Sequence, residues 1–210
     1  MNSMDIILKY FGDFTEKQVE QFASLDELYK EWNSKINVIS RKDIDSLYLK
    51  HVLHSLSIAA VINFLPDTQI IDVGTGGGFP GVPLAIFFPE VRFHLVDSIA
   101  KKLTIIKAVS ESIGLTNITT QHIRAEEIKN RQFDFAVSRA VAPVKDLMYW
   151  VNPLIKKTSR NSLVNGLICL KGGDLAQEIS ESNVRPRMIP ISTIFNEPFF
   201  EEKFLLHIPK

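Results

Sequence analysis

The sequence has little cysteine, no long hydrophobic run and no leader-like start. Only Cys169 carries a thiol among the 210 residues, so no disulfide can form within the chain. No Cys/His spacing typical of a structural metal site is present, and no run of about 18 apolar residues predicts a membrane-spanning helix. The first residues lack the basic cluster and apolar core of a secretory signal peptide. We therefore expect a cytoplasmic protein with no metal site and no membrane partner.

The sequence also lacks an excess of charge of either sign, since 24 Lys and Arg balance 24 Asp and Glu. The charges are nevertheless segregated: acids dominate residues 1–34, whereas Lys and Arg dominate residues 98–109 and 139–172. Such segregation can form a basic face on a neutral protein, and phosphate backbones bind to basic faces. The alternative is that each cluster is an ordinary solvated helix surface. The charge pattern thus permits nucleic-acid binding without establishing it.

The spacing of apolar residues changes near Pro66, which divides the chain in two. Before it, apolar residues recur at three- and four-residue steps, as on helices, apart from a loop expected at residues 33–40. After it, we expect strands at 69–73, 92–96, 118–122, 134–138 and 165–170, helices at 81–88, 99–113, 143–157 and 174–181, and a closing antiparallel hairpin of strands 187–194 and 203–208. This alternation predicts an α/β fold with a mostly parallel, Rossmann-like sheet and helices on both faces. We expect residues 1–65 to form an N-terminal helical cap and residues 66–210 the Rossmann-like domain.

A glycine-rich segment at residues 72–81, Asp-Val-Gly-Thr-Gly-Gly-Gly-Phe-Pro-Gly, lies between a predicted strand and a predicted helix. Such a loop can present bare backbone N–H groups to a nucleotide-like ligand at a helix N-terminus. Read as Gly76-x-Gly78-x-x-Gly81, it matches the dinucleotide fingerprint, in which a pyrophosphate sits on the helix N-terminus. Read from Asp72 as Asp-x-Gly-x-Gly-x-Gly, it matches the first motif of methyltransferases that use S-adenosylmethionine.

Three features favour the methyltransferase motif. The carboxylate of Asp72 would repel a pyrophosphate but can pair with the ammonium group of a methionine moiety. Pro80 supplies no N–H to an anion. The antiparallel hairpin also favours a methyltransferase, because a dehydrogenase of this length would have too few residues left for a second nucleotide half and a substrate domain. The remaining alternative is a glycine turn that binds no ligand.

Asp97 ends the next predicted strand, about 20 residues beyond the glycines, where a Rossmann-like site holds the ribose hydroxyls. The alternative is that Asp97 is only an N-cap of the following helix, although Ser98 can serve as that cap. The spacing to the glycine segment favours ribose binding.

Further motifs are found at intervals along the chain. They are Trp32-Asn33 with Asn37, His51 and Ser55, the extended segment Gly-Phe-Pro-Gly-Val-Pro-Leu-Ala-Ile at 78–86, Asp97-Ser98 with Lys101-Lys102, Arg124-Ala125-Glu126, Phe133-Asp134, Val137-Ser138-Arg139-Ala140 and Leu170-Lys171-Gly172. With these motifs the sequence resembles, over most of its length, the bacterial family first called glucose-inhibited division protein B, the guanine-N7 methyltransferases of 16S ribosomal RNA. The resemblance implies a Rossmann-like methyltransferase fold and S-adenosylmethionine as cofactor.

The resemblance and the strand-end positions together imply the residues of the cofactor site. They are Asp72, Gly74, Gly76, Gly78, Phe79, Asp97, Ala125, Glu126 and Arg139. Ala125 and Glu126 follow the third strand, where this class of enzyme places its adenine, and Phe79 is expected to cover the adenine or the methionine chain. Arg139 follows the fourth strand, where it can bind the cofactor, an RNA phosphate or a guanine edge. Alternatively, Arg139 caps a carbonyl or pairs with Asp72 or Glu126.

The substrate implied by the resemblance is a guanine of 16S ribosomal RNA, alone or in the small ribosomal subunit, and we expect the enzyme to be a monomer. The candidate RNA contacts are Lys101, Lys102, Lys156, Lys157 and Lys171. N7 of guanine has an in-plane lone pair and no proton, so we expect positioning groups and no general base. The sequence departs from the family pattern at His54, where an acid is usual, so no role that requires a carboxylate is expected there.

The sequence therefore predicts a methyltransferase that transfers a methyl group from S-adenosylmethionine to N7 of a guanine in 16S ribosomal RNA. The alternatives are a small-molecule or protein methyltransferase of the same fold, a nucleotide-binding oxidoreductase, and an RNA-binding module without activity.

Overall fold

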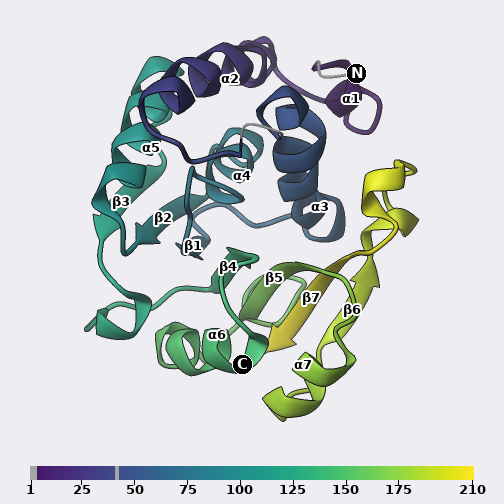
Figure 1. Ribbon diagram of the computed structural model, residues 1–210. Coiled ribbons are helices and arrows are strands. Elements are labelled where there is room, and N and C mark those ends of the chain that lie inside the picture. The colour runs from purple at the N-terminus through teal and green to yellow at the C-terminus, as the bar shows by residue number, and fades with distance from the viewer. Residues whose placement is uncertain (1–3, 41–42) are drawn as a thin grey trace.

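The computed structural model, which describes residues 4–40 and 43–210, contains a sheet in the order β3-β2-β1-β4-β5-β7-β6 (Figure 1). The strands of this described part are β1 (Gln69–Val73), β2 (Arg92–Asp97), β3 (Ile118–His122), β4 (Phe135–Arg139), β5 (Gly166–Gly172), β6 (Arg187–Pro190) and β7 (Lys203–Pro209). β7 runs antiparallel to both of its neighbours, so β6 runs in the same direction as β5. The mostly parallel sheet with an antiparallel hairpin is confirmed, and the second strand of the hairpin lies inside the sheet.

The strand order creates the crevice in which open α/β sheets bind their ligands. From β1 the chain moves outward through β2 to β3, returns to the centre as β4 and continues outward in the other direction. The connections after β1 and β4 therefore leave on opposite faces of the sheet, and a crevice opens at the carboxyl ends of these two strands. The glycine segment and Asp97 both lie at this edge.

Alternate residues of the strands face two separate hydrophobic clusters. Within β1, Ile70 belongs to a cluster shared with α4 and α5, whereas Ile71 belongs to a cluster shared with α6. The helices that cover the sheet are α4 (Gly81–Phe87), α5 (Ala100–Ser112), α6 (Val144–Val151) and α7 (Ala176–Ser182). Because successive strand residues point to opposite faces, this alternation buries both faces of the sheet. None of the helices described here is long and apolar enough to cross a membrane.

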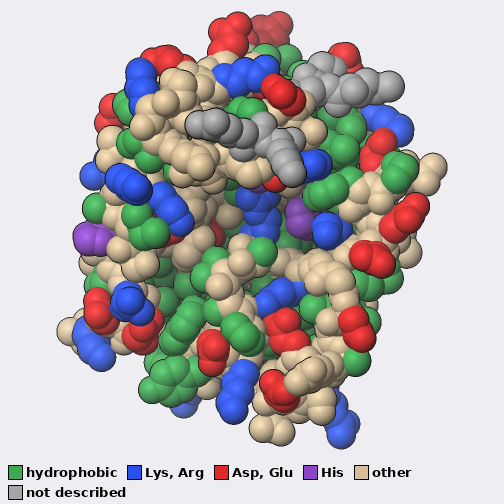
Figure 2. Space-filling model, viewed as in Figure 1, with side chains coloured by type: hydrophobic (Ala, Val, Ile, Leu, Met, Phe, Trp, Pro, Cys, Tyr) green, Lys and Arg blue, Asp and Glu red, His purple; other side chains and the backbone are tan. Residues whose placement is uncertain are grey.

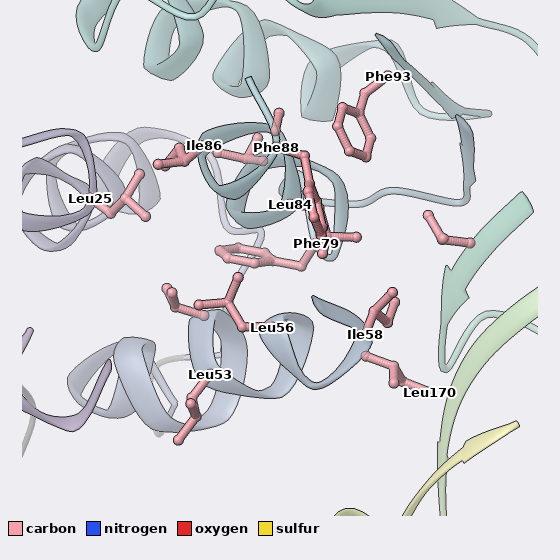
Figure 3. Close-up of a cluster of buried hydrophobic side chains, with 14 of the residues drawn as sticks. Leu25, Leu53, Leu56, Ile58, Phe79, Leu84, Ile86, Phe88, Phe93 and Leu170 are labelled. Atoms are coloured by element: carbon pink, nitrogen blue, oxygen red, sulfur yellow. The ribbon is translucent and has the colours of Figure 1, made fainter. Parts of the chain in front are cut away.

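The helices of the first 65 residues pack into the first of these clusters. They are α1 (Asp5–Leu8), α2 (Glu16–Lys35), the 3₁₀ turn η1 (Ile44–Ser46), the π-helical turn η2 (Tyr48–Leu53) and α3 (His54–Val61). Leu25 of α2 and Leu56 of α3 lie in the same cluster as Leu84 of α4 (Figure 3). The apolar side chains of these helices share one core with the sheet, so a separate cap of residues 1–65 stays a prediction.

The helix expected over residues 143–157 is shorter in the structure. α6 ends at Val151, and a 3₁₀ turn, η4 (Asn152–Leu154), follows. Pro153 explains this end, because proline supplies no N–H to the helical ladder. Residues 156 and 157 consequently lie outside the helix on which the sequence pattern placed them.

Two other boundaries also differ from expectation. β6 ends at Pro190 instead of continuing to residue 194, since proline cannot extend the ladder, and a 3₁₀ turn, η5 (Ile191–Thr193), follows. The loop expected at 33–40 begins only after Lys35, where α2 ends.

Gly166 is the position at which the insertion of β7 leaves no room for a side chain. It pairs with Pro209, and a Cβ at Gly166 would lie 2.1 Å from the carbonyl oxygen of Ile208. We predict that Gly166→Ala lowers the free energy of unfolding by about 2 kcal/mol or more, because the backbone of β7 must move. Gly12→Ala is the matched control, since a Cβ there meets nothing within 4 Å. Urea unfolding of both variants tests the prediction, and equal stabilities would contradict it.

Candidate cofactor site

A cavity of about 430 Å³ lies at the carboxyl edge of the sheet, where the strand order predicts a ligand. We call it the cofactor cavity. Its wall follows the strand ends and consists of Val73, Gly74, Val96, Asp97, Ser98, Ile99, Lys102, Ile123, Arg124, Ala125, Glu126, Arg139, Ala140, Val141 and Trp150. Of the predicted cofactor residues, Asp72, Gly76, Gly78 and Phe79 are not in this wall. The described residues contain no group of three His, Cys, Asp or Glu side chains that could hold a metal ion.

Backbone N–H groups of the glycine segment bond within the protein. The donors are the three glycines of the dinucleotide frame: Gly76 donates to Asp97 Oδ2 (2.9 Å), Gly78 to the Thr75 carbonyl (2.9 Å) and Gly81 to Asp72 Oδ2 (2.9 Å). None of these N–H groups is left for a pyrophosphate. The expectation that the loop presents free N–H groups to a ligand is therefore wrong for these three glycines. Their bonding within the protein favours the methyltransferase motif over the dinucleotide fingerprint.

Helix α2 holds the glycine segment from the side of the N-terminal helices. The buried hydroxyl of Tyr29 donates to the carbonyl of Gly77 at 2.6 Å. Next to it, Gly78 has a φ of +99°, and a Cβ there would lie 2.6 Å from Val82 and 3.1 Å from the Tyr29 hydroxyl. Only glycine fits this close approach. Tyr29 was not predicted as a site residue, because helical spacing alone does not show which loop a helix contacts.

Asp72 is fully buried beneath the glycine segment. Its Oδ2 accepts hydrogen bonds from the Thr75 hydroxyl (2.7 Å) and the Gly81 N–H (2.9 Å), whereas its Oδ1 has no partner among the described residues. Burial raises the pKa of the Asp72 carboxyl to about 7, against the opposing effect of these hydrogen bonds and of Arg139. A buried acceptor with no partner, one residue before the cavity wall, fits the ammonium group of S-adenosylmethionine.

Asp97 lines the cofactor cavity and also organises it. Its Oδ2 accepts the Gly76 N–H, its Oδ1 accepts the Ile99 N–H (2.8 Å), and Lys102 Nζ lies 3.8 Å from Oδ2. The N-cap of α5 is Ile99 and it has no side-chain cap bond, so Asp97 bonds to the N–H of the cap residue and is not itself the N-cap of the alternative interpretation. The Gly76 bond ties the same carboxylate to the glycine segment. A carboxylate has about four acceptor sites, so both oxygens can still accept ribose hydroxyls.

Ala125 and Glu126 follow β3 after two intervening residues, in the 3₁₀ turn η3 (Ala125–Glu127), and both line the cofactor cavity. Ala125 is buried, whereas Glu126 is exposed and 4.0 Å from Arg124. Trp150 of α6 lines this part of the cavity as well, so the wall includes a large aromatic side chain. Trp150 was not among the predicted site residues, because it lies in a helix and not at the end of a strand.

Arg139, the last residue of β4, links the cavity wall to the N-terminal helices. It donates to the carbonyl of Lys50 (3.3 Å) and to Nδ1 of His51 (2.8 Å). Burial lowers the pKa of Arg139 to about 10. Arg139 thus bonds to a backbone carbonyl, which was one of the alternatives to a ligand contact. It forms no ion pair with Asp72 or Glu126 among the described contacts.

Phe79 occupies a different place from the one expected. Its ring is buried, with the rings of Tyr29 and His51 at centroid distances of 5.0 and 5.1 Å. The guanidinium of Arg139 lies 5.1 Å from the same ring. Phe79 therefore supports Arg139 through a cation–π contact and does not cover the ligand space directly.

Three of the predicted RNA-binding lysines have different environments near the cavity. Lys101 is exposed on α5, but its neighbour Lys102 lines the cofactor cavity. Lys171 is only 8% exposed and forms an ion pair with Glu178 at 2.6 Å. An RNA contact by Lys171 would require this buried pair to open.

The other two predicted RNA contacts lie at the opposite edge of the sheet. Lys156 pairs with the buried carboxylate of Asp134 (3.0 Å), which also accepts the N–H of Gln69 at the amino end of β1 (2.8 Å). Lys157 is exposed beside it. The geometry gives no support to an RNA contact of these lysines near the cofactor cavity, and their role stays a prediction.

We predict that Asp97→Asn lowers the affinity for S-adenosylhomocysteine about tenfold or more. The amide keeps the shape but loses the charge-assisted bonds to the Gly76 N–H and to ribose hydroxyls, which contribute about 1.5–3 kcal/mol. Isothermal titration calorimetry measures the dissociation constant, and thermal unfolding without ligand checks the fold. An unchanged dissociation constant would contradict ribose binding by Asp97.

The raised pKa of Asp72 predicts a pH dependence of cofactor binding. Because the ligand ammonium would bind the ionised carboxylate, the affinity for S-adenosylhomocysteine should rise about tenfold between pH 6 and pH 8, as Asp72 loses its proton near pH 7. The contribution of Asp72 to stability should change in the opposite sense: folding raises this pKa, so its contribution to the free energy of unfolding falls as the pH rises from about 4 to 7. The buried histidines, whose pKa values are lowered, act in the other direction, so this contribution is measured as the difference between wild type and Asp72→Asn at each pH. Asp72→Asn should also remove the pH dependence of the affinity. A wild-type affinity that is flat with pH would contradict the ammonium contact.

Solved structures of low sequence identity share this fold. A SAM-dependent methyltransferase from Aquifex aeolicus is similar with a TM-score of 0.57 and 12% identity, over 81% of this chain and 98% of its own. A mutant of MtNAS, in complex with S-adenosylmethionine, is similar with a TM-score of 0.58 and 14% identity, over 92% of this chain and 76% of its own.

Sequence comparisons cover nearly the whole chain. The Ribosomal RNA small subunit methyltransferase G of Phocaeicola vulgatus is 56% identical over 205 residues, which are 98% of each chain. The protein of the same name from Flavobacterium johnsoniae is 52% identical over 206 residues, again 98% of each chain. The family model of rRNA small subunit methyltransferase G matches residues 18–195. The predicted resemblance is confirmed, and the chain belongs to the rRNA small subunit methyltransferase G family.

Proposed function

We propose that this protein transfers the methyl group of S-adenosylmethionine to N7 of a guanine in 16S ribosomal RNA. The observation that carries the proposal is the row of carboxylates at the carboxyl edge of the sheet: Asp72 in β1, Asp97 at the end of β2 and Glu126 after β3. The ammonium, ribose and adenine amino groups of the cofactor are donors that such acceptors would bind. Family membership supports the ribosomal RNA substrate.

Methyl transfer to N7 requires alignment and no proton transfer. The N7 lone pair forms the new bond to the methyl carbon while the carbon–sulfur bond breaks and its electrons stay on sulfur. The products are S-adenosylhomocysteine and an N7-methylguanine that carries the positive charge. The protein contributes by holding both reactants in line, an effect that can reach about 7 kcal/mol or more in favourable cases.

The surface beside the cofactor cavity supports an RNA substrate. Lys, Arg and His side chains gather in a hollow between α3 and the strands β4 and β5 (Figure 2). Although the chain has no net charge, such a local excess of cations attracts a phosphate backbone. We further propose that the enzyme acts as a monomer in the cytoplasm, on free RNA or on the assembled small subunit.

Methylation assays with a matched inactive variant test this function. We predict that the wild-type protein forms N7-methylguanine at one position of 16S RNA taken from a strain that lacks the gene, and that Gly76→Asp forms none. A Cβ at Gly76 meets no protein atom closer than 4.0 Å, although its φ of +59° would cost a residue with a Cβ about 1–2 kcal/mol. Thermal unfolding therefore checks that the variant folds, and its carboxylate would enter the ligand space and repel Asp72.

The readouts are mapping of N7-methylguanine and calorimetric binding of S-adenosylhomocysteine. A wild-type protein that binds S-adenosylhomocysteine but methylates neither free RNA nor small subunits would contradict the RNA substrate. That outcome would favour a small-molecule or protein methyltransferase.

A further inference from the structure

A second pocket, of about 330 Å³, adjoins the cofactor cavity. Its wall includes Lys50, His51 and His54 of the N-terminal helices, Lys171 of β5, and Phe199 and Lys203 near the start of β7. We call it the basic pocket. It shares Arg139 and Ala140 with the cofactor cavity, so a ligand in one lies next to a ligand in the other. The hollow of Figure 2 opens over these elements.

The cations of the basic pocket are not all neutralised. Two are paired with acids: Lys50 with Asp43 (2.6 Å) and Lys171 with Glu178 (2.6 Å). Arg139 and Lys203 have no carboxylate within ion-pair distance among residues 4–40 and 43–210. Lys203 is half-buried, and its Nζ lies 5.4 Å from the centroid of the Phe199 ring. Unpaired cations in a partly desolvated pocket are costly unless an anion joins them.

The two histidines add hydrogen-bonding capacity without adding charge. Burial lowers the pKa of His51 and of His54 to about 3, so both rings are neutral at pH 7. His54 is only 7% exposed, and Nε2 of each ring has no partner in the described structure. Because a guanidinium can only donate, the bond from Arg139 to His51 Nδ1 places the His51 proton on Nε2. His51 therefore has an unused N–H donor.

We infer that the basic pocket binds a phosphate of the RNA substrate beside the target guanine, with Arg139 and Lys203 supplying the charge. The inference rests on the proposed function. Ala140, between the two sites, has a φ of 51°. This left-handed conformation costs about 1–2 kcal/mol for a residue with a Cβ, and such strain is found where a site requires a fixed backbone. A phosphate held in this pocket would direct the neighbouring base towards the cofactor cavity.

Lys203→Ala tests the inference, because Lys203 belongs to the basic pocket and not to the wall of the cofactor cavity. We predict that the variant raises the KM for RNA about tenfold with little change in kcat. The slope of log Kd for RNA against log salt concentration should fall by about one. The Kd for S-adenosylhomocysteine should stay within about twofold of wild type, and Lys203→Arg should restore most of the RNA affinity, since it keeps the charge.

Lys17→Ala is the matched control for the loss of one positive charge. Lys17 is exposed in the first turn of α2, where its neighbour Gln18 bonds to the carbonyls of Ile86 and Phe87 at the other end of α4 from the glycine segment. This variant should leave the KM and the salt slope unchanged. Thermal unfolding of each variant shows that the fold is retained.

Two results would overturn the inference. If Lys203→Ala keeps the wild-type KM and salt slope, the pocket holds no RNA phosphate. If Lys203→Ala loses affinity for S-adenosylhomocysteine and keeps the RNA salt slope, the anion is the carboxylate of the cofactor. A wild-type protein that methylates no ribosomal RNA would instead contradict the proposed function. The RNA affinity of Lys203→Ala and its salt slope would still show whether the basic pocket binds an RNA phosphate.

Discussion

The buried carboxylate of Asp72 is the contact on which the geometry of the site depends. Through one oxygen it joins β1 to the Thr75 hydroxyl and to the first N–H of α4 at Gly81. A Cβ at Gly81 would lie 2.8 Å from that oxygen. A larger residue at this position would therefore push the carboxylate away and break its bond to the N–H. The turn between strand and helix is thereby closed on itself, and the second oxygen has no partner among the described residues. The burial that makes this carboxylate costly to ionise also strengthens its bond to a cation.

The N-terminal helices take part in the site as well as covering it. Tyr29 fixes the carbonyl of Gly77, and the carbonyl of Lys50 together with the His51 ring fixes Arg139. The first contact crosses from the N-terminal helices to the glycine segment, and the second crosses to the end of β4. Positioning by packed helices reduces the number of conformations that the glycine segment and the guanidinium can adopt before a ligand arrives, which is the basis of preorganisation.

Sequence patterns were informative where a role follows from the position of a residue along a strand. The carboxyl ends of parallel strands meet at one edge, so the strand pattern could place Asp97 at the cavity, and the strand pattern together with the family resemblance could place Glu126 there. Trp150 could not be placed in this way, because helical spacing does not show which part of a helix returns to the crevice. The sequence also could not predict the environment of Lys156. This environment depends on the end of α6 at Val151 and on the ion pair with Asp134 at the amino edge of the sheet. Charge clusters along a sequence do not separate solvated cations from paired ones.

The position of β7 has a consequence for how the protein is made. β7 lies between β5 and β6 but follows both in the chain, so a growing polypeptide presents β5 as an open edge until residues 203–209 have been synthesised. An open, hydrophobic edge is a site for mispairing with other chains, and domains fold as units during synthesis. Lys203 is the first residue of β7. Closure of the sheet and completion of the basic pocket therefore occur in the same event, so a nascent chain cannot have the pocket before its sheet edge is protected.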